Sequence, residues 1–270
     1  MNLALERIEG SHPDRSIAFL HGILGSGRNL QTVARRFVAE HPHWTAWLVD
    51  LRGHGRSPKG TAGASLGAAA QDVSETAAAQ GPPLAGIAGH SFGGKVALEV
   101  ARQNTIPSLK RVIVIDSMPG SREPLQGADS ALSILKLLES LPDTFPSITE
   151  FVAALENAGI TRPVAQWLAG SLERRSDSVR FGLDHREIRA LMLDYFARDL
   201  WPVVENPPGE VQIHLVIGEQ SDSYSSSDRE RAQRIAVVNP RVKVTLLPAG
   251  HWVHVDDPDG LLAAMSDLEV

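Results

Sequence analysis

A five-residue turn near the middle of the chain restricts the possible folds more than any other feature. Residues 89–93 read GHSFG and lie between an apolar stretch, LAGIAGH, and a helical pattern, GKVALEVARQ. A glycine on each side of the serine lets a strand and a helix pass very close to each other. Such a turn lifts its central side chain above the carboxyl edge of a parallel sheet. The turn therefore predicts an α/β sheet with Ser91 presented at that edge.

The rest of the chain repeats the same alternation of strand and helix. Short apolar runs bounded by Gly, Asp or Pro predict buried strands within residues 15–22 and 44–55 and at residues 84–90, 111–116, 211–217 and 242–247. Helical patterns lie between them at residues 29–40, 66–79 and 94–103. This order predicts a doubly wound, mostly parallel sheet. Residues 1–117 and 206–270 are expected to form this α/β core.

Residues 118–205 interrupt the alternation. Four helical patterns follow one another there, at residues 130–141, 147–158, 163–174 and 186–200, with prolines near their ends. Such a block between two strands predicts a helical cap over the carboxyl ends of the strands, where ligands of open α/β sheets bind. Six aromatic residues of this block are candidates for the pocket wall: Phe145, Phe151, Trp167, Tyr195, Phe196 and Trp201.

Composition excludes several classes of function. The formal net charge is −6, and no basic patch indicates nucleic-acid binding. The absence of cysteine removes disulfides, thiolate metal sites and a cysteine nucleophile. The N-terminal segment lacks a secretory pattern, and no apolar run approaches the length of about 20 residues that a membrane span needs. We therefore expect a cytoplasmic protein without a membrane span; the sequence leaves its oligomeric state open.

Two further segments complete a candidate catalytic site around Ser91. PAGHWVH follows the last predicted strand, and a histidine there, after the serine in chain order, is suited to act as general base. His251 follows the glycine directly and is assigned this role, whereas His254 is expected to be structural. The loop ILGSG follows an earlier strand, and the backbone N–H groups of Ile23 and Phe92 are expected to form an oxyanion hole.

Four segments of the chain resemble the α/β-hydrolase superfamily: FLHGILGS, LVDLRGHGRSP, AGHSFGGKVALEVA and PAGHWVHVDDP. They are most similar to its branch of small bacterial and mitochondrial acyl esterases. The resemblance implies hydrolysis of small acyl esters or thioesters, with neither a metal nor an organic cofactor.

The same resemblance implies two candidates for the acid that orients the histidine. In most of the superfamily the acid follows the penultimate strand, which would give Asp222, although the usual position holds Ser221 here. In the esterase branch the acid instead ends the strand after the nucleophile helix, where this chain has Asp116. A serine then occupies the later site and helps to orient the histidine, a role that falls to Ser221. Asp116 is therefore preferred, with Asp222 as the alternative.

The sequence thus predicts a serine hydrolase with a Ser91–His251–Asp116 triad and an acyl-enzyme intermediate. Other chemistries on the same fold keep the serine and stay open: carbon–carbon bond hydrolysis, a lyase reaction of the menaquinone-pathway type, and perhydrolysis. A non-catalytic ligand receptor is a further alternative.

Overall fold

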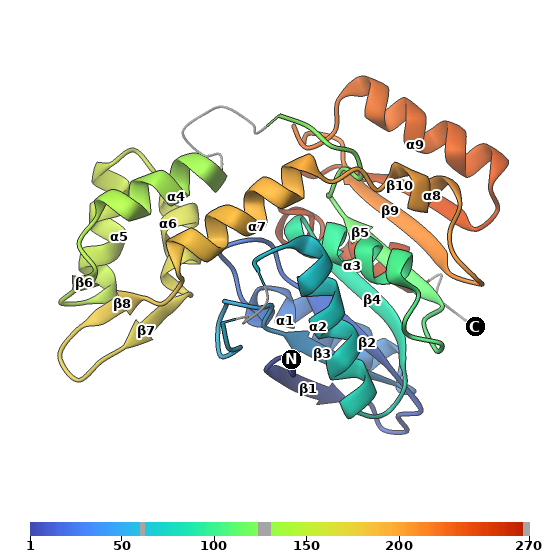
Figure 1. The fold of residues 1–270 in the computed structure, drawn as a ribbon, viewed down its shortest axis with the longest axis horizontal. Helices are drawn as coiled ribbons and strands as arrows, with labels where there is room; N and C mark the ends of the chain where they lie inside the picture. The colour runs from blue at the N-terminus through green and yellow to red at the C-terminus, as the bar shows by residue number, and fades with distance from the viewer. Residues whose placement is uncertain (60–62, 124–130, 267–270) are drawn as a thin grey trace.

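In the structure, a computed structural model that describes residues 1–59, 63–123 and 131–266, a seven-stranded sheet forms the centre of the fold (Figure 1). Its strands lie in the order β1-β3-β2-β4-β5-β9-β10. Their bounds are β1 Leu5–Glu9, β2 Arg15–Leu20, β3 Trp44–Val49, β4 Leu84–His90, β5 Arg111–Ile115, β9 Gln212–Gly218 and β10 Val242–Leu247. All neighbouring pairs are parallel except β1 with β3. The predicted fold class is confirmed.

Helices cover both faces of this sheet. One face carries η1 Gly27–Leu30, α1 Gln31–Glu40, α10 Val253–Asp256 and α11 Pro258–Ser266, and the other carries α2 Leu66–Ala79, α3 Phe92–Gln103, α8 Trp201–Glu205 and α9 Ser226–Val238. The strands supply both layers by alternation: Ile17 and Phe19 of β2 pack towards α1, and Ala18 and Leu20 pack towards α2 and α3. Alanines of α2, such as Ala69 and Ala70, allow that helix to lie close to the sheet.

A large insertion, residues 118–205, separates β5 from β9. It begins with α4 Ala131–Ser140, α5 Ile148–Asn157, α6 Arg162–Ala169 and α7 His185–Ala197, and ends with α8. It also contains a three-stranded antiparallel sheet in the order β6-β8-β7, with β6 Thr144–Phe145, β7 Leu172–Arg174 and β8 Val179–Phe181. Figure 1 shows α4 to α6 and this small sheet grouped at one end of the molecule, with α7 running back towards the main sheet.

Two details differ from the sequence predictions, and a third lies partly outside the described residues. The insertion is not purely helical, because residues 172–174, predicted as the end of a helix, form β7 after α6 ends at Ala169. The first cap helix was predicted from residue 130, which lies outside the described residues, and α4 is described from Ala131. The edge strand β1 was not predicted, because its charged residues obscure the apolar pattern. In the described part of the chain, no helix combines the length and hydropathy of a membrane crossing.

Candidate active site

Ser91 lies on a strained turn between β4 and α3. Its backbone has φ 51° and ψ −115°, a conformation that residues other than glycine rarely adopt. Two glycines make the turn possible, because a Cβ on Gly89 would lie 2.1 Å from the carbonyl oxygen of Gly93, and one on Gly93 would lie 2.3 Å from that of Leu20. The backbone N–H of Ser91 donates to Ile115 of β5 at 3.0 Å. The strain is therefore held in place by close packing on both neighbouring strands.

The loop after β2 lies directly beside this turn. A Cβ on Gly22 would lie 3.5 Å from the Cβ of Ser91, and Ile23 lines the same pocket as Ser91. Phe92 is the first residue of α3, where backbone N–H groups have no acceptor within their own helix. The amides of Ile23 and Phe92 are thus on the two segments that border Ser91.

Two buried histidines hold this loop. His21 accepts a hydrogen bond from the N–H of Leu51 at 3.0 Å, and His54 accepts one from the N–H of Leu24 at 3.2 Å. Each ring contacts a carbonyl oxygen through its Nδ1 atom, which fixes the tautomer with the proton on Nδ1. Burial lowers the pKa of His21 and lowers that of His54 to about 3, so both rings stay neutral acceptors at neutral pH. Their role here is structural.

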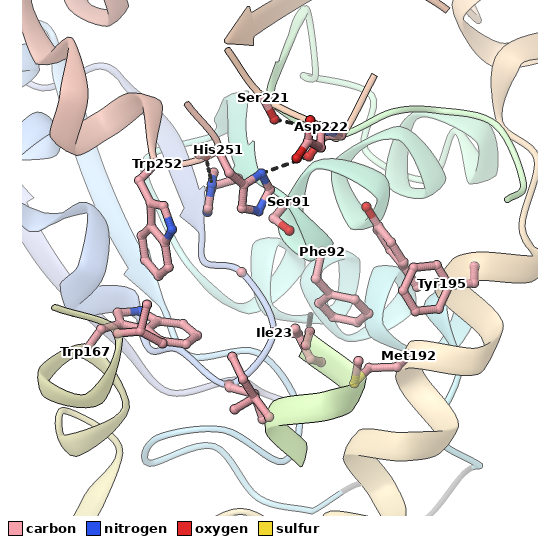
Figure 2. Close-up of a pocket in the computed structure, with 18 of the residues that line it drawn as sticks. Ile23, Ser91, Phe92, Trp167, Met192, Tyr195, Ser221, Asp222, His251 and Trp252 are labelled. Carbon is pink, nitrogen blue, oxygen red and sulfur yellow. Dashed lines mark hydrogen bonds between the residues drawn. The ribbon is translucent and has the colours of Figure 1, made fainter. Parts of the chain in front are cut away.

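His251 lies in the loop after β10 and contacts Asp116, which follows β5. The distance from Nδ1 of His251 to Oδ2 of Asp116 is 2.7 Å. The side chain of His251 is 36% exposed, whereas that of Asp116 is fully buried. Ser91 and His251 both line the same pocket, and Figure 2 shows them together on its wall. With Asp116 on Nδ1, the Nε2 atom is the ring nitrogen left to serve Ser91.

The carboxylate of Asp116 is held from several sides. Asp116 directly follows β5 and has a positive φ of 43°, and its N–H donates to the carbonyl of Val216 of β9 at 2.8 Å. Its Oδ1 accepts the N–H of Gly218 at 3.0 Å, and its Oδ2 accepts the hydroxyl of Ser221. These hydrogen bonds fix the orientation of the buried carboxylate and the oxygen that faces His251.

Ser223 is a residue of this site that the sequence analysis missed. Its hydroxyl lies 2.9 Å from Nδ1 of His251, and its N–H donates to the hydroxyl of Ser221 at 3.1 Å. Four serines lie within residues 221–226, so the local sequence does not indicate which of them contacts the ring. The two carboxylates named from the sequence are placed differently, since Asp222 is exposed at the pocket while Asp116 lies against His251.

His254 lies away from the carboxylate, packed against His90 with ring centroids 4.7 Å apart. Burial lowers the pKa of His254 to about 4 and lowers that of His90 well below the ordinary value. His90 contacts the backbone carbonyl of His251 at 2.8 Å through its Nε2 atom. These two neutral rings support the loop that carries His251.

A cavity of about 550 Å³ opens at Ser91 between the core and the insertion (Figure 2). Its apolar lining consists of Ile23, Leu24, Phe92, Ala131, Ile134, Val164, Trp167, Met192, Tyr195, Phe196 and Trp252. Of the six aromatic residues proposed from the sequence, Trp167, Tyr195 and Phe196 line it. The other three, Phe145, Phe151 and Trp201, are buried instead in the packing of the insertion and its base. Trp167 meets Trp252 edge to face, with ring centroids 4.8 Å apart, across the two parts of the molecule.

The mixed seven-stranded sheet, with a strained serine turn at its carboxyl edge, is the α/β-hydrolase fold. The chain belongs to the Alpha/beta hydrolase family, whose pattern matches residues 17–264. The family resemblance predicted from the sequence is confirmed.

Comparison with individual proteins agrees with this assignment. The chain is 26% identical to the mouse sn-1-specific diacylglycerol lipase ABHD11, covering 98% of this chain and 84% of the relative. It is also 26% identical to esterase YbfF of Escherichia coli, covering 98% of this chain and 97% of the relative. A solved structure of a marine microorganism esterase has the same fold, with a TM-score of 0.79, 24% identity and 99% of each chain covered. The protein is therefore an esterase/lipase-type hydrolase.

Proposed function

We propose that the protein is a serine esterase that cleaves carboxylic ester or thioester bonds of small acyl substrates through Ser91, His251 and Asp116. One observation carries the proposal: the 2.7 Å contact of Asp116 with the Nδ1 atom of the histidine that shares a pocket with the strained Ser91. A carboxylate at Nδ1 fixes the proton there and leaves Nε2 free to accept the proton of a serine hydroxyl. The general base and the nucleophile are then on one wall of one cavity.

In the first half of the proposed reaction, Ser91 Oγ attacks the carbonyl carbon and its proton passes to Nε2 of His251. The negative charge that develops on the carbonyl oxygen is stabilised by the backbone N–H groups of Ile23 and Phe92. One donor of this kind contributes about 10²- to 10³-fold in kcat. His251 then protonates the leaving alcohol or thiol, and the acyl group stays on Ser91.

In the second half, water replaces the alcohol or thiol in the pocket. His251 removes a proton from this water, which attacks the acyl-enzyme and releases the carboxylic acid and the free hydroxyl of Ser91. The carboxylate of Asp116 stabilises the imidazolium formed in each half. Its hydrogen bonds from Gly218 and Ser221 support this role, because they hold the carboxylate in position against His251.

The cavity supports an acyl substrate of modest size. Its walls are largely apolar, and about 550 Å³ is within the range of small-molecule pockets. The polar lining includes Ser91, His251 and Ser223, whose hydroxyl contacts the His251 ring, and the ester group itself would bind beside them. The name of the mouse relative makes a diacylglycerol a substrate to include in the test beside simple esters and thioesters.

The test combines covalent labelling with a substrate panel. A fluorophosphonate should label Ser91 in the wild-type protein and not in Ser91→Ala, and the same protein should hydrolyse p-nitrophenyl esters and acyl-CoA thioesters of graded chain length. No labelling and no turnover would sink the proposal in favour of a ligand-binding protein. Labelling of Ser91 without turnover of any ester or thioester would point to one of the other reactions that keep this serine.

A further inference from the structure

The insertion is attached to the core by two chain segments that run side by side. We call residues 118–122 and 195–200 the stem. The N–H of Leu200 donates to the carbonyl of Pro119 at 2.9 Å, and the N–H of Arg122 donates to the carbonyl of Phe196 at 2.9 Å. The second stem segment begins with Tyr195, whose side chain lines the cavity. The position of the stem therefore determines where this part of the pocket wall lies.

Lys95 is directly beneath the stem, one helical turn after Ser91 on α3. Its ammonium donates three hydrogen bonds: to the carbonyls of Gly120 and Tyr195, each at 2.7 Å, and to that of Arg198 at 2.9 Å. All three acceptors are backbone atoms of the stem, one on its first segment and two on its second. Every N–H of the ammonium is thus used to join the nucleophile helix to both segments of the stem.

A buried lysine without an ion-pair partner lowers the stability of the folded protein, so a purely structural position would not favour it. Lys95 is fully buried, and among the described residues no carboxylate lies within 4.0 Å of its ammonium to form an ion pair. The charged groups around it are Arg122 and Arg198, which disfavour its charge, and Asp194 and Asp199, which favour it; Glu99, one turn further on α3, is paired with Arg102. Burial, the largest cause, lowers the pKa of Lys95 to about 7.

The contact reaches the pocket through aromatic rings. The Lys95 ammonium lies 4.5 Å from the centroid of the Tyr195 ring. That ring in turn lies 6.0 Å, centroid to centroid, from Phe92, the residue next to Ser91. Movement of the stem relative to α3 would therefore move Tyr195 relative to the reacting serine.

We propose that Lys95 is a positioning residue that sets the distance between the stem and the nucleophile helix, and thereby the depth of the acyl pocket above Ser91. It touches no substrate and acts through the backbone of Tyr195. Loss of its three hydrogen bonds frees the stem to shift, which changes the fit of long acyl chains more than that of short ones. The inference rests on the proposed esterase function.

The experiment replaces Lys95 by methionine, which keeps a similar length without any N–H donor. The quantity measured is the ratio of kcat/KM for a long p-nitrophenyl ester to that for the acetate, with enzyme concentration set by fluorophosphonate titration. We expect the ratio to change by about tenfold, the order of discrimination that a displaced pocket contact gives, mainly through KM. Lys136→Met, the same change at an exposed position on α4, is the control and should leave the ratio unchanged.

A second measurement uses the wild-type protein and covers the case in which Lys95→Met does not fold. Above about pH 7 the lysine loses a proton and can donate only two hydrogen bonds, so the ratio should change between about pH 6 and about pH 8.5. A change in the catalytic step that affects both esters alike cancels in the ratio. In Lys95→Met this pH dependence should vanish.

The outcomes separate the two proposals. A wild-type ratio that is flat over this pH range, or a folded Lys95→Met with wild-type ratio and pH dependence, overturns the role of Lys95 while esterase activity stands. Absence of labelling and of ester turnover in the wild-type protein overturns the proposed function itself.

Discussion

Ser221 donates its hydroxyl to Oδ2 of Asp116, the carboxylate oxygen that faces His251, although the two residues are 105 positions apart in the sequence. They meet because each follows one of two neighbouring parallel strands, β5 and β9. The carboxylate of the site thus comes from the residue after β5, and the hydroxyl that donates to it comes from the loop after β9. This pairing agrees with the sequence pattern in which an acid at the earlier position accompanies a serine at the later one.

Replacing Ser91 by alanine tests the nucleophile. Hydrolysis of p-nitrophenyl butyrate should fall by several orders of magnitude, about 10⁶-fold at most, because the residual rate comes only from binding and the oxyanion hole. Alanine removes only the hydroxyl, so circular dichroism and the thermal midpoint should stay close to wild type. A variant that keeps more than about a hundredth of the wild-type kcat contradicts the assignment.

Asp116 and Asp222 give a matched pair of variants. Asp116→Asn should lower kcat by up to about 10⁴-fold, because an amide stabilises the wrong tautomer of His251 and cannot stabilise the imidazolium. Asp222→Asn should change kcat by less than about threefold, since this exposed side chain does not contact the ring in the described structure. The opposite order of the two effects would make Asp222 the acid.

The serines around the carboxylate should have smaller effects than the acid. Ser221→Ala removes one hydrogen bond to Asp116, and Ser223→Ala removes a hydroxyl at Nδ1 of His251. A single hydrogen bond contributes about 1 kcal/mol net, so each variant should lose about fivefold in kcat/KM. Ser225→Ala, in the same loop but exposed and capping α9, is the control and should keep full activity. Losses as large as that of Asp116→Asn would mean that the serines orient the ring as strongly as the carboxylate does.

Some of these features were accessible from sequence because local patterns encode them. The turn at residues 89–93, the buried strands and the helix at residues 66–79 each carry their own signal in apolar spacing and glycine placement. Asp116 was also named as the preferred acid, with Asp222 as the alternative, but this came from the resemblance to the esterase branch, in which an acid at this position accompanies a serine at the position of Ser221. These features depend on short segments or on the ends of strands whose order is fixed by the fold.

Features that depend on distant partners were missed. β7 and β8 have three residues each and form their hydrogen bonds only by pairing, β7 with β8 and β8 also with β6, so nothing in LER or VRF alone distinguishes them from a helix end. Lys95 reads as an ordinary polar residue of a helix, because its three acceptors lie 25 to 103 positions away. Ile134 and Val164 line the pocket but were not named from the sequence. Tertiary packing decides which face of a cap helix meets the core, and the local sequence does not show it.

The free energy of unfolding of a Gly93 variant tests the close packing of the turn. In Gly93→Ala the new Cβ would lie 2.3 Å from the carbonyl oxygen of Leu20, a backbone atom of a central strand that cannot yield. We expect a loss of about 3 kcal/mol or more in the free energy of unfolding, measured by urea denaturation. Gly67→Ala is the control: its Cβ would have an ordinary contact of 3.5 Å in α2, and the protein should gain up to about 1 kcal/mol. Equal stability of the two variants would contradict the close strand–helix approach at Ser91.

The buried histidines should make the protein unstable in mild acid. Burial lowers the pKa of His54 to about 3 and the pKa values of His214 and His254 to about 4, from an ordinary value of 6.5. Between these values the unfolded chain binds protons that the folded protein does not, so the free energy of unfolding falls as the pH falls below about 6.5. The loss continues to about pH 4, and above about pH 6.5 these groups contribute no pH dependence.

His214→Gln isolates one of these protons, because His214 lies on β9 and contacts Thr245 at 2.8 Å, outside the candidate site. In urea denaturation between about pH 4.5 and about pH 7.5, the slope of unfolding free energy against pH should decrease by about 1.4 kcal/mol per pH unit within the acid part of that range. Glutamine can keep a hydrogen bond to the threonine, so stability at neutral pH should change little. His12→Gln, at an exposed position, should leave the slope as in wild type. Proton uptake by the unfolded chain alone must lower the free energy of unfolding between about pH 6.5 and about pH 4.5. A wild-type protein that is equally stable at these two pH values would therefore show that the fold does not keep the histidines neutral.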